Sequence, residues 1–223
     1  MKEFLNILVV DDHPMTIDAY INLINDIDSN SKFSFTKATN CKTAYSSIEV
    51  YKKTKESLDV ALIDINIPPF EQEKILSGTD IAKIVRLKFP LCKIIMLTMH
   101  QEHLILNKVF KTINPEGFIS KNDIDFTTFP EIFLKIIKGQ NYFSPTINNS
   151  LATLFKNTVK WDQYDTQIII LIEKGIKTKD LTTYIDLSLS SIEKRKANIK
   201  RQIADKKVTD DELIIICKTL KLI

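Results

Sequence analysis

The apolar residues of the first 140 positions gather in short runs that are separated by amphipathic segments. Short, β-branched runs are typical of strands buried on both faces of a parallel sheet. Such strands are predicted at residues 4–10, 58–64, 93–98 and 117–121, and alternating polarity predicts another at 32–38. Between them, apolar residues recur at helical spacing. Helices are predicted after Pro14 and at 42–55, 81–88, 102–112 and 129–138.

Strand and helix alternate five times, which sets the expected fold of the first part of the chain. Parallel strands that are joined by helices form right-handed crossovers and a doubly wound α/β layer. From residue 162 onward no strand pattern is present. Four helices are predicted there, at 164–174, 178–184, 190–204 and 210–222. We therefore expect an α/β domain at 1–140, a linker at 141–160 that carries a short helix, and a small all-α domain at 161–223.

Charge divides the chain in the same way. Residues 150–223 hold 14 Lys or Arg and 10 Asp or Glu, a balance of +4, whereas residues 1–149 hold 17 and 18, a balance of −1. A near-neutral first part and a basic last part of the chain indicate that only the last part binds a polyanion. A basic helix in a protein-binding bundle is the alternative.

Composition excludes several classes of protein. The three cysteines are scattered, which argues against a disulfide framework or a zinc site and favours a reducing cytoplasm. No apolar run is long enough to cross a bilayer, and the first residues lack the apolar core of a signal peptide. Four glycines are too few for a Gly-rich phosphate loop.

Polar side chains stand where the predicted strands end. These residues are Asp11, Asp12, Asp64, Thr98 and Lys121. The carboxyl ends of parallel strands share one edge of the sheet, where the ligands of such folds gather. Three carboxylates at one edge repel one another unless a cation neutralises them, and oxygen ligands of this kind suit Mg²⁺.

A carboxylate beside a divalent ion, an ammonium and a hydroxyl is equipped for phosphoryl transfer. Asp64 would attack a phosphoryl group and form an aspartyl phosphate, while Mg²⁺ and Lys121 stabilise the charge on its oxygens and Thr98 donates a hydrogen bond. His13, His100 and His103 are interpreted as surface residues, because no acidic or cysteine partner stands at ligand spacing in the sequence.

These residues resemble the receiver domain of two-component response regulators. The resemblance covers residues 4–138 and implies a flavodoxin-like fold with strand order 2-1-3-4-5. It implies Mg²⁺ bound by Asp12, Asp64 and the carbonyl of Asn66, with Asp11 acting through water. It also implies that a partner histidine kinase phosphorylates Asp64. Thr98 and Phe118 stand at the positions of the family's switch residues, and Phe118 is expected to turn inward behind Thr98.

The segment after Asp64 departs from this family. It is about six residues longer than usual before Gly78, carries Pro68-Pro69, and is expected to lie over the phosphorylation site. The charged run 71–74 within it is interpreted as a solvated loop face.

The basic second domain has the pattern of a helix-turn-helix. It looks like the LuxR/NarL-type DNA-binding domain, on the turn 171–175, Lys179-Asp180-Leu181, the helix start Ser190-Ser191-Ile192 and Asn198-Ile199. Ile192, Ile199 and Ile203 are expected in the core. The expected DNA-contacting residues are Lys179, Ser190, Ser191, Lys194, Arg195, Asn198, Lys200 and Arg201. Glu193 departs from the family, which has lysine there, and Lys194 and Arg195 are expected to compensate.

The last helix is more apolar than a one-sided surface helix needs. In the family that the second domain resembles, the corresponding helix pairs two domains. We therefore expect a homodimer when phosphorylated, on a near-palindromic double-stranded DNA target.

The sequence leads to a cytoplasmic, phosphorylation-dependent transcription regulator that is not an enzyme. The alternative is a receiver-based adaptor whose C-terminal bundle binds protein. A third possibility is a phosphatase-type enzyme with an aspartyl nucleophile.

Overall fold

The computed structural model describes residues 4–27, 32–99, 103–158, 161–203, 207–219 and 222–223. The chain divides into two compact units. The first comprises Met1–Gln101 with Thr112–Ile147, and the second comprises Glu102–Lys111 with Asn148–Ile223. In the described part of the chain, no helix combines the length and the apolar character that crossing a bilayer requires.

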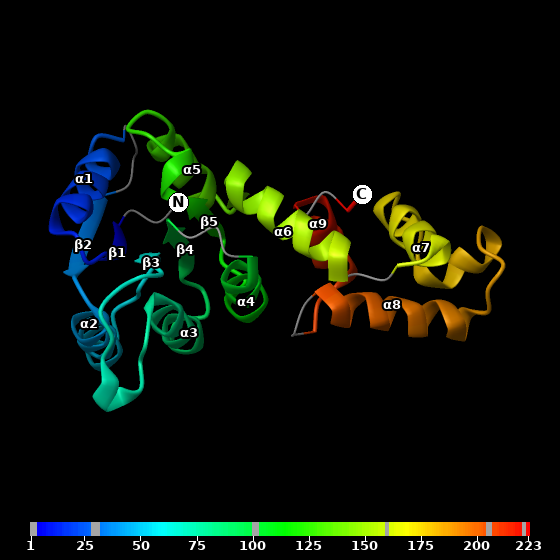
Figure 1. The fold of residues 1–223 in the computed structure, drawn as a ribbon, viewed down its shortest axis with the longest axis horizontal. Coiled ribbons are helices and arrows are strands. Elements are labelled where there is room, and N and C mark those ends of the chain that lie inside the picture. Colours follow the sequence, from blue (N-terminus) through cyan, green and yellow to red (C-terminus); the bar gives the residue numbers. More distant parts are fainter. Residues whose placement is uncertain (1–3, 28–31, 100–102, 159–160, 204–206, 220–221) are drawn as a thin grey trace. The chain divides into compact units, whose positions relative to one another are not determined.

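A parallel sheet forms the centre of the first unit (Figure 1). The strand order is β2-β1-β3-β4-β5-β6, so the predicted order 2-1-3-4-5 is confirmed and a short sixth strand extends the sheet beyond β5. The strands are β1 (Phe4–Val10), β2 (Lys32–Ala38), β3 (Val60–Asp64), β4 (Lys93–Thr98), β5 (Gly117–Ser120) and β6 (Tyr142–Phe143).

Helices cover both faces of this sheet. Helices α1 and α5 pack on one face, while α2 and α3 lie on the other (Figure 1). Ile7 and Leu8 of β1 point to opposite faces, and both are fully buried. That explains why the strands are continuous apolar runs. The helices of this unit are α1 (Pro14–Asn25), α2 (Cys41–Thr54), α3 (Gly78–Lys88) and α5 (Thr128–Ile137), with short 3₁₀ helices η1 (Glu71–Glu73) and η2 (Lys121–Asp123).

The predicted helix bounds are confirmed to within a few residues, and local sequence explains where the helices start. Pro14 occupies the first turn of α1, where a missing N–H costs nothing. Asn40 caps α2 by accepting a hydrogen bond from the Thr43 amide, and the Thr43 hydroxyl accepts one from the Asn40 amide. Helix α4 (His103–Ile113) follows β4, and most of it clusters with the second unit.

The second unit contains only helices in its described residues. They are most of α4 and α6 (Pro145–Thr158), then α7 (Gln163–Glu173), the 3₁₀ helix η3 (Thr178–Thr183), α8 (Leu189–Ile203) and α9 (Asp210–Thr219). Its core includes Ile168, Leu181, Ile185 and Ile192. Asp162 caps α7 through the amides of Tyr164 and Asp165.

After residue 140, one expectation needs correction and one short strand was not expected. The segment 178–184 is not an α-helix but a 3₁₀ helix, because the hydroxyls of Thr182 and Thr183 donate to the carbonyls three residues earlier and favour the tighter turn. The segment predicted as a linker carries the expected short helix, which is α6, and it also contains strand β6, which was not predicted. The boundaries of the two functional domains stay a prediction.

Candidate phosphoacceptor site and basic helix

Two acidic side chains lie together at the carboxyl edge of the sheet. Strands β1 and β3 are neighbours, and their register pairs Val10 with Ile63, so Asp11 and Asp64 follow at the same level. Asp11 is completely buried and Asp64 is only 5% exposed. Buried carboxylates need partners, because water no longer stabilises their charge.

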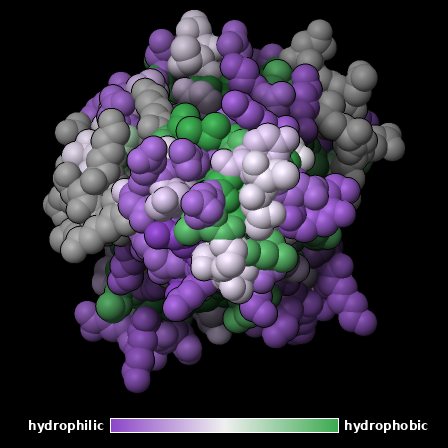
Figure 2. Space-filling view, turned by 90° about the vertical axis from the view of Figure 1, so that its right-hand side faces the viewer, coloured by the Kyte–Doolittle hydropathy of each residue, from purple (hydrophilic) through white to green (hydrophobic). Residues whose placement is uncertain are grey.

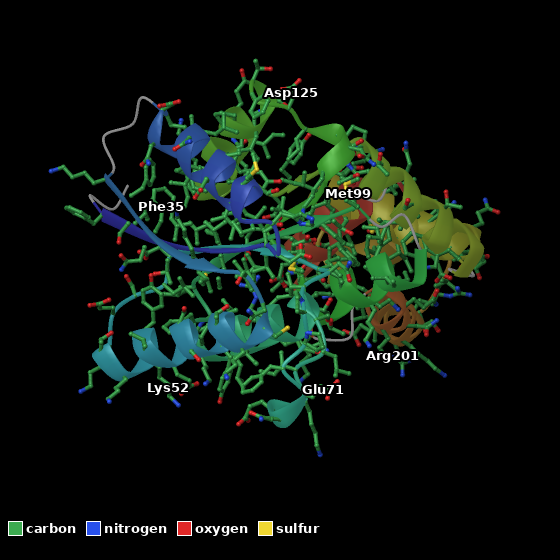
Figure 3. The ribbon with its side chains drawn as sticks, turned by 60° about the vertical axis from the view of Figure 1, so that its left-hand side comes forward. Phe35, Lys52, Glu71, Met99, Asp125 and Arg201 are labelled. Carbon is green, nitrogen blue, oxygen red and sulfur yellow. The ribbon has the colours of Figure 1, made fainter. Side chains whose placement is uncertain are left out.

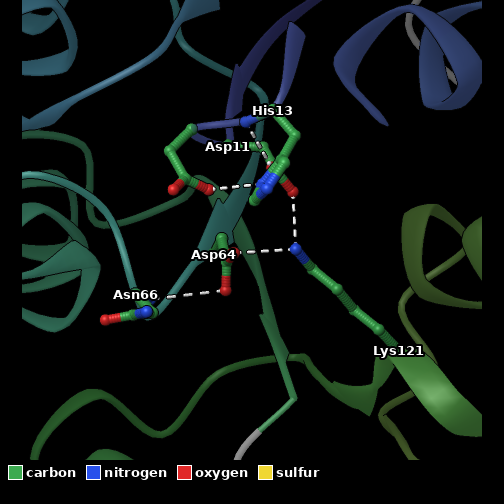
Figure 4. A network of polar contacts seen from close by, with 6 residues as sticks. Asp11, His13, Asp64, Asn66 and Lys121 are labelled. Carbon is green, nitrogen blue, oxygen red and sulfur yellow. Dashed lines mark hydrogen bonds and ion pairs between the residues drawn. The ribbon is translucent and has the colours of Figure 1, made fainter. Parts of the chain in front are cut away.

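Lys121 provides that partner. It is the first residue of η2, directly after β5, and its ammonium nitrogen lies 2.7 Å from Asp11 Oδ2 and 2.7 Å from Asp64 Oδ2 (Figure 4). The three residues come from three different strand ends. The sequence-based prediction that these positions share one edge of the sheet is therefore confirmed.

Burial and pairing shift the ionisation of this group. Burial raises the pKa of Asp64, and the hydrogen bond from Lys121 offsets only part of that effect. Burial disfavours the charged form of Lys121, but its hydrogen bonds to Asp11 and Asp64 outweigh burial and raise the pKa of the amine. Lys121 is thus held as an ammonium next to a carboxylate that is costly to ionise.

Asp12 and His13 extend the acidic group toward solvent. His13 Nδ1 lies 2.7 Å from Asp12 Oδ1 and 3.4 Å from Asp11 Oδ1, and the His13 amide donates to Asp11 Oδ1 at 2.9 Å. The His13 side chain is 73% exposed, so the prediction of a surface residue holds, but the reason was wrong, because two acids do adjoin it. His100 lies outside the described residues, as does the side chain of His103.

The donor set fits a hard divalent cation. Asp11, Asp12 and His13 offer ligand atoms that all lie within 4.8 Å of one another, and Asp64 adds a further carboxylate beside Lys121. The Asn66 amide donates to Asp64 Oδ1 at 3.3 Å, which fixes the start of the following loop at the site. Three carboxylates against one ammonium leave a negative charge that Mg²⁺ would neutralise.

Thr98 and Phe118 lie on the neighbouring strands. Thr98 ends β4 and is completely buried, in register with Ser120 of β5. Phe118 is also completely buried, and its ring meets that of Phe143 of β6 edge to face, with 6.3 Å between the ring centroids. The switch role of both residues stays a prediction.

The loop after Asp64 does not lie over the site as expected. It folds into a small hairpin in which Phe70 and Ile75 exchange backbone hydrogen bonds, and the Cys41 amide of α2 donates to Pro68. Its tip at Glu71 projects away from the sheet (Figure 3). Aromatic contact between Tyr45 of α2 and Phe70 holds it there, a long-range contact that the sequence pattern does not reveal.

Gly78 fixes the return of this loop to the sheet. A Cβ atom on Gly78 would lie 1.8 Å from the carbonyl oxygen of Asp64, which no side chain tolerates. The Gly78 amide donates to the Ile65 carbonyl at 3.0 Å. The start of α3 is therefore packed directly against the backbone of Asp64.

The predicted DNA-contacting residues, most of them on α8, fall into an exposed group and a group that is paired with acids. Ile192, Ile199 and Ile203 are buried, as predicted. The exposed residues are Ser190, Lys194, Asn198 and Arg201, with Lys179 exposed in η3 and Ser191 half-buried. Arg201 projects outward from α8 (Figure 3). Hydrophilic side chains cover most of the face shown in Figure 2.

The other predicted cations are paired within the unit. Arg195 Nη1 lies 2.8 Å from Asp162 and 2.9 Å from Asp165, and the guanidinium lies over the ring of Tyr164. Lys200 Nζ lies 2.7 Å from Asp210. Arg195 is thus already paired with two acids of its own unit, and its expected compensation for Glu193 stays a prediction. Its acidic partners lie 30 and 33 residues away, beyond any local pattern.

Comparison with known proteins agrees with this geometry. Residues 7–127 match the family model of the response regulator receiver domain. The oxygen regulatory protein NreC of Staphylococcus carnosus (strain TM300) is 26% identical over 212 residues, covering 89% of this chain and 91% of that protein. NreC of Staphylococcus aureus (strain JH9) is 26% identical over 215 residues, with the same coverage.

Solved structures show the same fold along the chain. The response regulator RcsB of Salmonella typhimurium superposes with a TM-score of 0.55 at 18% identity, covering 97% of this chain and 99% of that one. RcsB in a complex with DNA gives a TM-score of 0.54 at 18% identity, covering 97% and 98%.

Proposed function

The chain belongs to the response regulator receiver family, and we propose that it is a phosphorylation-dependent transcription regulator. Asp64 accepts a phosphoryl group from a sensor histidine kinase, and the second unit binds double-stranded DNA, as a homodimer in the phosphorylated state. The chemistry takes place on the protein's own carboxylate, so no turnover of an external substrate is assigned.

The observation that carries this proposal is the bridge that Lys121 makes between Asp11 and Asp64. A carboxylate oxygen of Asp64 attacks the phosphorus of a phosphohistidine, an O–P bond forms, and the P–N bond breaks as the imidazole leaves. The Lys121 ammonium stays within reach of the new phosphoryl oxygens, and Thr98 donates to one of them.

Asp11, Asp12, Asp64 and the Asn66 carbonyl would hold Mg²⁺ at this site. The bound ion supplies further positive charge to the oxygens of the transferred group. Asp11 already accepts hydrogen bonds from the His13 amide and Lys121, which supports its role through water rather than by direct coordination.

Helix α8 supports the DNA-binding part. Lys194, Asn198 and Arg201 share an exposed side of a helix that follows a short helix and a turn, with Ser190 at its start. Cations at such positions contact phosphates, and polar side chains read base edges. RcsB, whose fold the chain shares, has been solved bound to DNA.

The dimer part rests on α9. Leu213, Ile216 and Cys217 are buried within the unit, which accounts for much of the apolar character of this helix, and Ile215 remains 52% exposed. An exposed isoleucine on α9 supports pairing of two copies. The free and buried state of all three cysteines supports a reducing, cytoplasmic location.

Salt-dependent DNA binding tests the proposal. We expect the full chain to bind a labelled random-sequence duplex at low salt, with log affinity falling linearly against log salt, and Mg²⁺ with beryllofluoride to strengthen binding. Asp64→Asn should keep the basal binding and lose the strengthening. No binding at low salt would contradict the proposal and favour the adaptor with a protein-binding bundle.

A further inference from the structure

The chain around Lys121 is joined to the segment that leads into α6. The Ser120 amide donates to Ser144 Oγ at 3.0 Å, and the Ser144 amide donates to the Phe118 carbonyl at 3.0 Å. Both serines are completely buried. Strand β6 pairs with β5 just before this point, and Phe118 packs on Phe143. Residues 117–120 and 142–144 are therefore joined by an unbroken series of backbone and side-chain hydrogen bonds.

The start of α6 depends on a residue from outside the helix. Pro145 opens the helix and has no N–H, so the Thr146 amide is the first that needs an acceptor. Ser144 stands where serine commonly caps a helix, but its hydroxyl oxygen accepts from Ser120. Asp123 takes over the cap: it accepts from the Thr146 amide at 2.8 Å and from the Thr146 hydroxyl at 2.7 Å.

Asp123 and Lys121 are the two ends of the same short turn. Helix η2 is only Lys121–Asp123, so one end carries the ammonium that binds Asp64 and the other carries the carboxylate that caps α6. Burial opposes ionisation of Asp123, but hydrogen bonds from Ser144 and Thr146 outweigh it and lower the pKa of the carboxyl. A charged carboxylate at a helix N-terminus is favourable.

We propose that Asp123 is a positioning residue that couples the phosphoacceptor site to helix α6. The inference rests on the proposed function, because the signal starts at Asp64. When Asp64 becomes an acyl phosphate, the charge that faces Lys121 moves to the phosphoryl oxygens. Lys121 shifts toward those oxygens, and the short helix η2 moves with it. Asp123, at the other end of η2, transmits this movement to the first turn of α6, the helix whose remainder belongs to the second unit.

Hydrogen exchange of the full chain tests this coupling. With Mg²⁺ and beryllofluoride, we expect exchange of the first-turn amides of α6 to change in the wild-type protein. In Asp123→Ala those amides should exchange about fivefold faster without any ligand, as loss of a helix cap implies, and they should no longer respond to beryllofluoride. Asp123→Asn, which keeps an acceptor oxygen, should restore part of the response.

Asp125→Ala is the matched control. Asp125 accepts from the amides of Thr127 and Thr128 at the start of α5 in the same way, and among the described side chains it makes no hydrogen bond to α6. This variant should keep the α6 response. The inference is overturned if Asp123→Ala responds like the wild type, or if Asp125→Ala abolishes the response equally.

A second readout separates this inference from its premise. Intact mass after incubation with acetyl phosphate should show the same phosphoryl adduct on wild type and on Asp123→Ala. A normal adduct with an unresponsive α6 in the wild type would overturn the coupling alone. A wild-type protein that forms no adduct would overturn the proposed function as well.

Discussion

Two cations, one in each unit, are each held by two carboxylates, and their surroundings differ. Lys121 is 15% exposed, and its partners Asp11 and Asp64 have side chains that are 0% and 8% exposed. Arg195 is 32% exposed, and the side chains of its partners Asp162 and Asp165 are 51% and 8% exposed. The first arrangement is buried, so each charge depends on the others. The second is partly open, because water and salt screen Arg195 and Asp162 while Asp165 lies buried.

The same kind of pairing between one cation and two carboxylates therefore has a different effect in each unit. At the sheet edge, pairing holds the Lys121 ammonium beside Asp64, the carboxylate proposed to accept the phosphoryl group. On α8, pairing removes Arg195 from the set of unpaired cations and joins the start of α7 to α8. What remains for an external polyanion on the exposed side of α8 is Lys194 and Arg201. Four sets of substitutions would break or sharpen this comparison.

The largest effect is expected from a methyl group behind Asp64. Gly78→Ala places a Cβ against the Asp64 carbonyl, so the loop and β3 must separate at a cost above about 3 kcal/mol. Chemical denaturation of the full chain measures it. The control in the second unit is Gly175→Asn, at a glycine with φ of 81° and open space around it, where asparagine is tolerated. Equal stability of Gly78→Ala and wild type would contradict the close packing.

Removing the buried cation should have the next largest effect. Lys121→Ala leaves Asp11 and Asp64 without their shared partner, and we expect a loss of about 3 kcal/mol at neutral pH. Formation of the acyl phosphate from acetyl phosphate should slow about 100-fold. Mg²⁺ should restore part of the stability, because it neutralises the same acids. Lys37→Ala, which breaks an exposed pair with Asp18, should cost under about 1 kcal/mol; a similar cost at both sites would refute the distinction.

Charge removal on α8 should separate free from paired cations. Lys194→Ala and Arg201→Ala should each reduce the slope of log affinity for DNA against log salt by about one unit, because each removes a phosphate contact. Arg195→Ala should leave the slope nearly unchanged and lower the melting temperature that Trp161 fluorescence reports for the second unit. If Arg195→Ala lowers the slope as much as Arg201→Ala, the pairing of Arg195 does not hold in solution.

The smallest effect is expected from the ion pairs of Asp210 with Lys196 and Lys200 in the second unit. Burial opposes ionisation of Asp210, but hydrogen bonds from Lys200 and Lys196 outweigh it and lower the pKa below the ordinary 3.8. Its stabilising contribution is therefore present above that value and disappears as pH falls through the folded-state pKa. The stability difference between wild type and Asp210→Asn should stay below about 1 kcal/mol, because Asp210 is 37% exposed, and it should vanish in acid. A difference that grows in acid would contradict the pairing.

Local pattern predicted most of the fold and the gathering of Asp11, Asp64 and Lys121 at one edge of the sheet. Strand ends such as Asp64 and Thr98 are fixed by periodicity alone, and parallel topology brings them together. Features set by distant partners escaped prediction. The pairing of Arg195 with Asp162 depends on how α7 and α8 pack, and β6 is two residues long, too short for periodicity to register. Asp123 looks like an ordinary turn residue until Thr146 is seen beside it.

Mapping the modified residue tests the central claim most directly. The full chain is incubated with Mg²⁺ and acetyl phosphate, and the product is located by intact and peptide mass. The account predicts one phosphoryl group, on Asp64, and none on Asp64→Asn. An unmodified wild-type chain at every donor concentration, or an adduct on another residue that persists in Asp64→Asn, would contradict it.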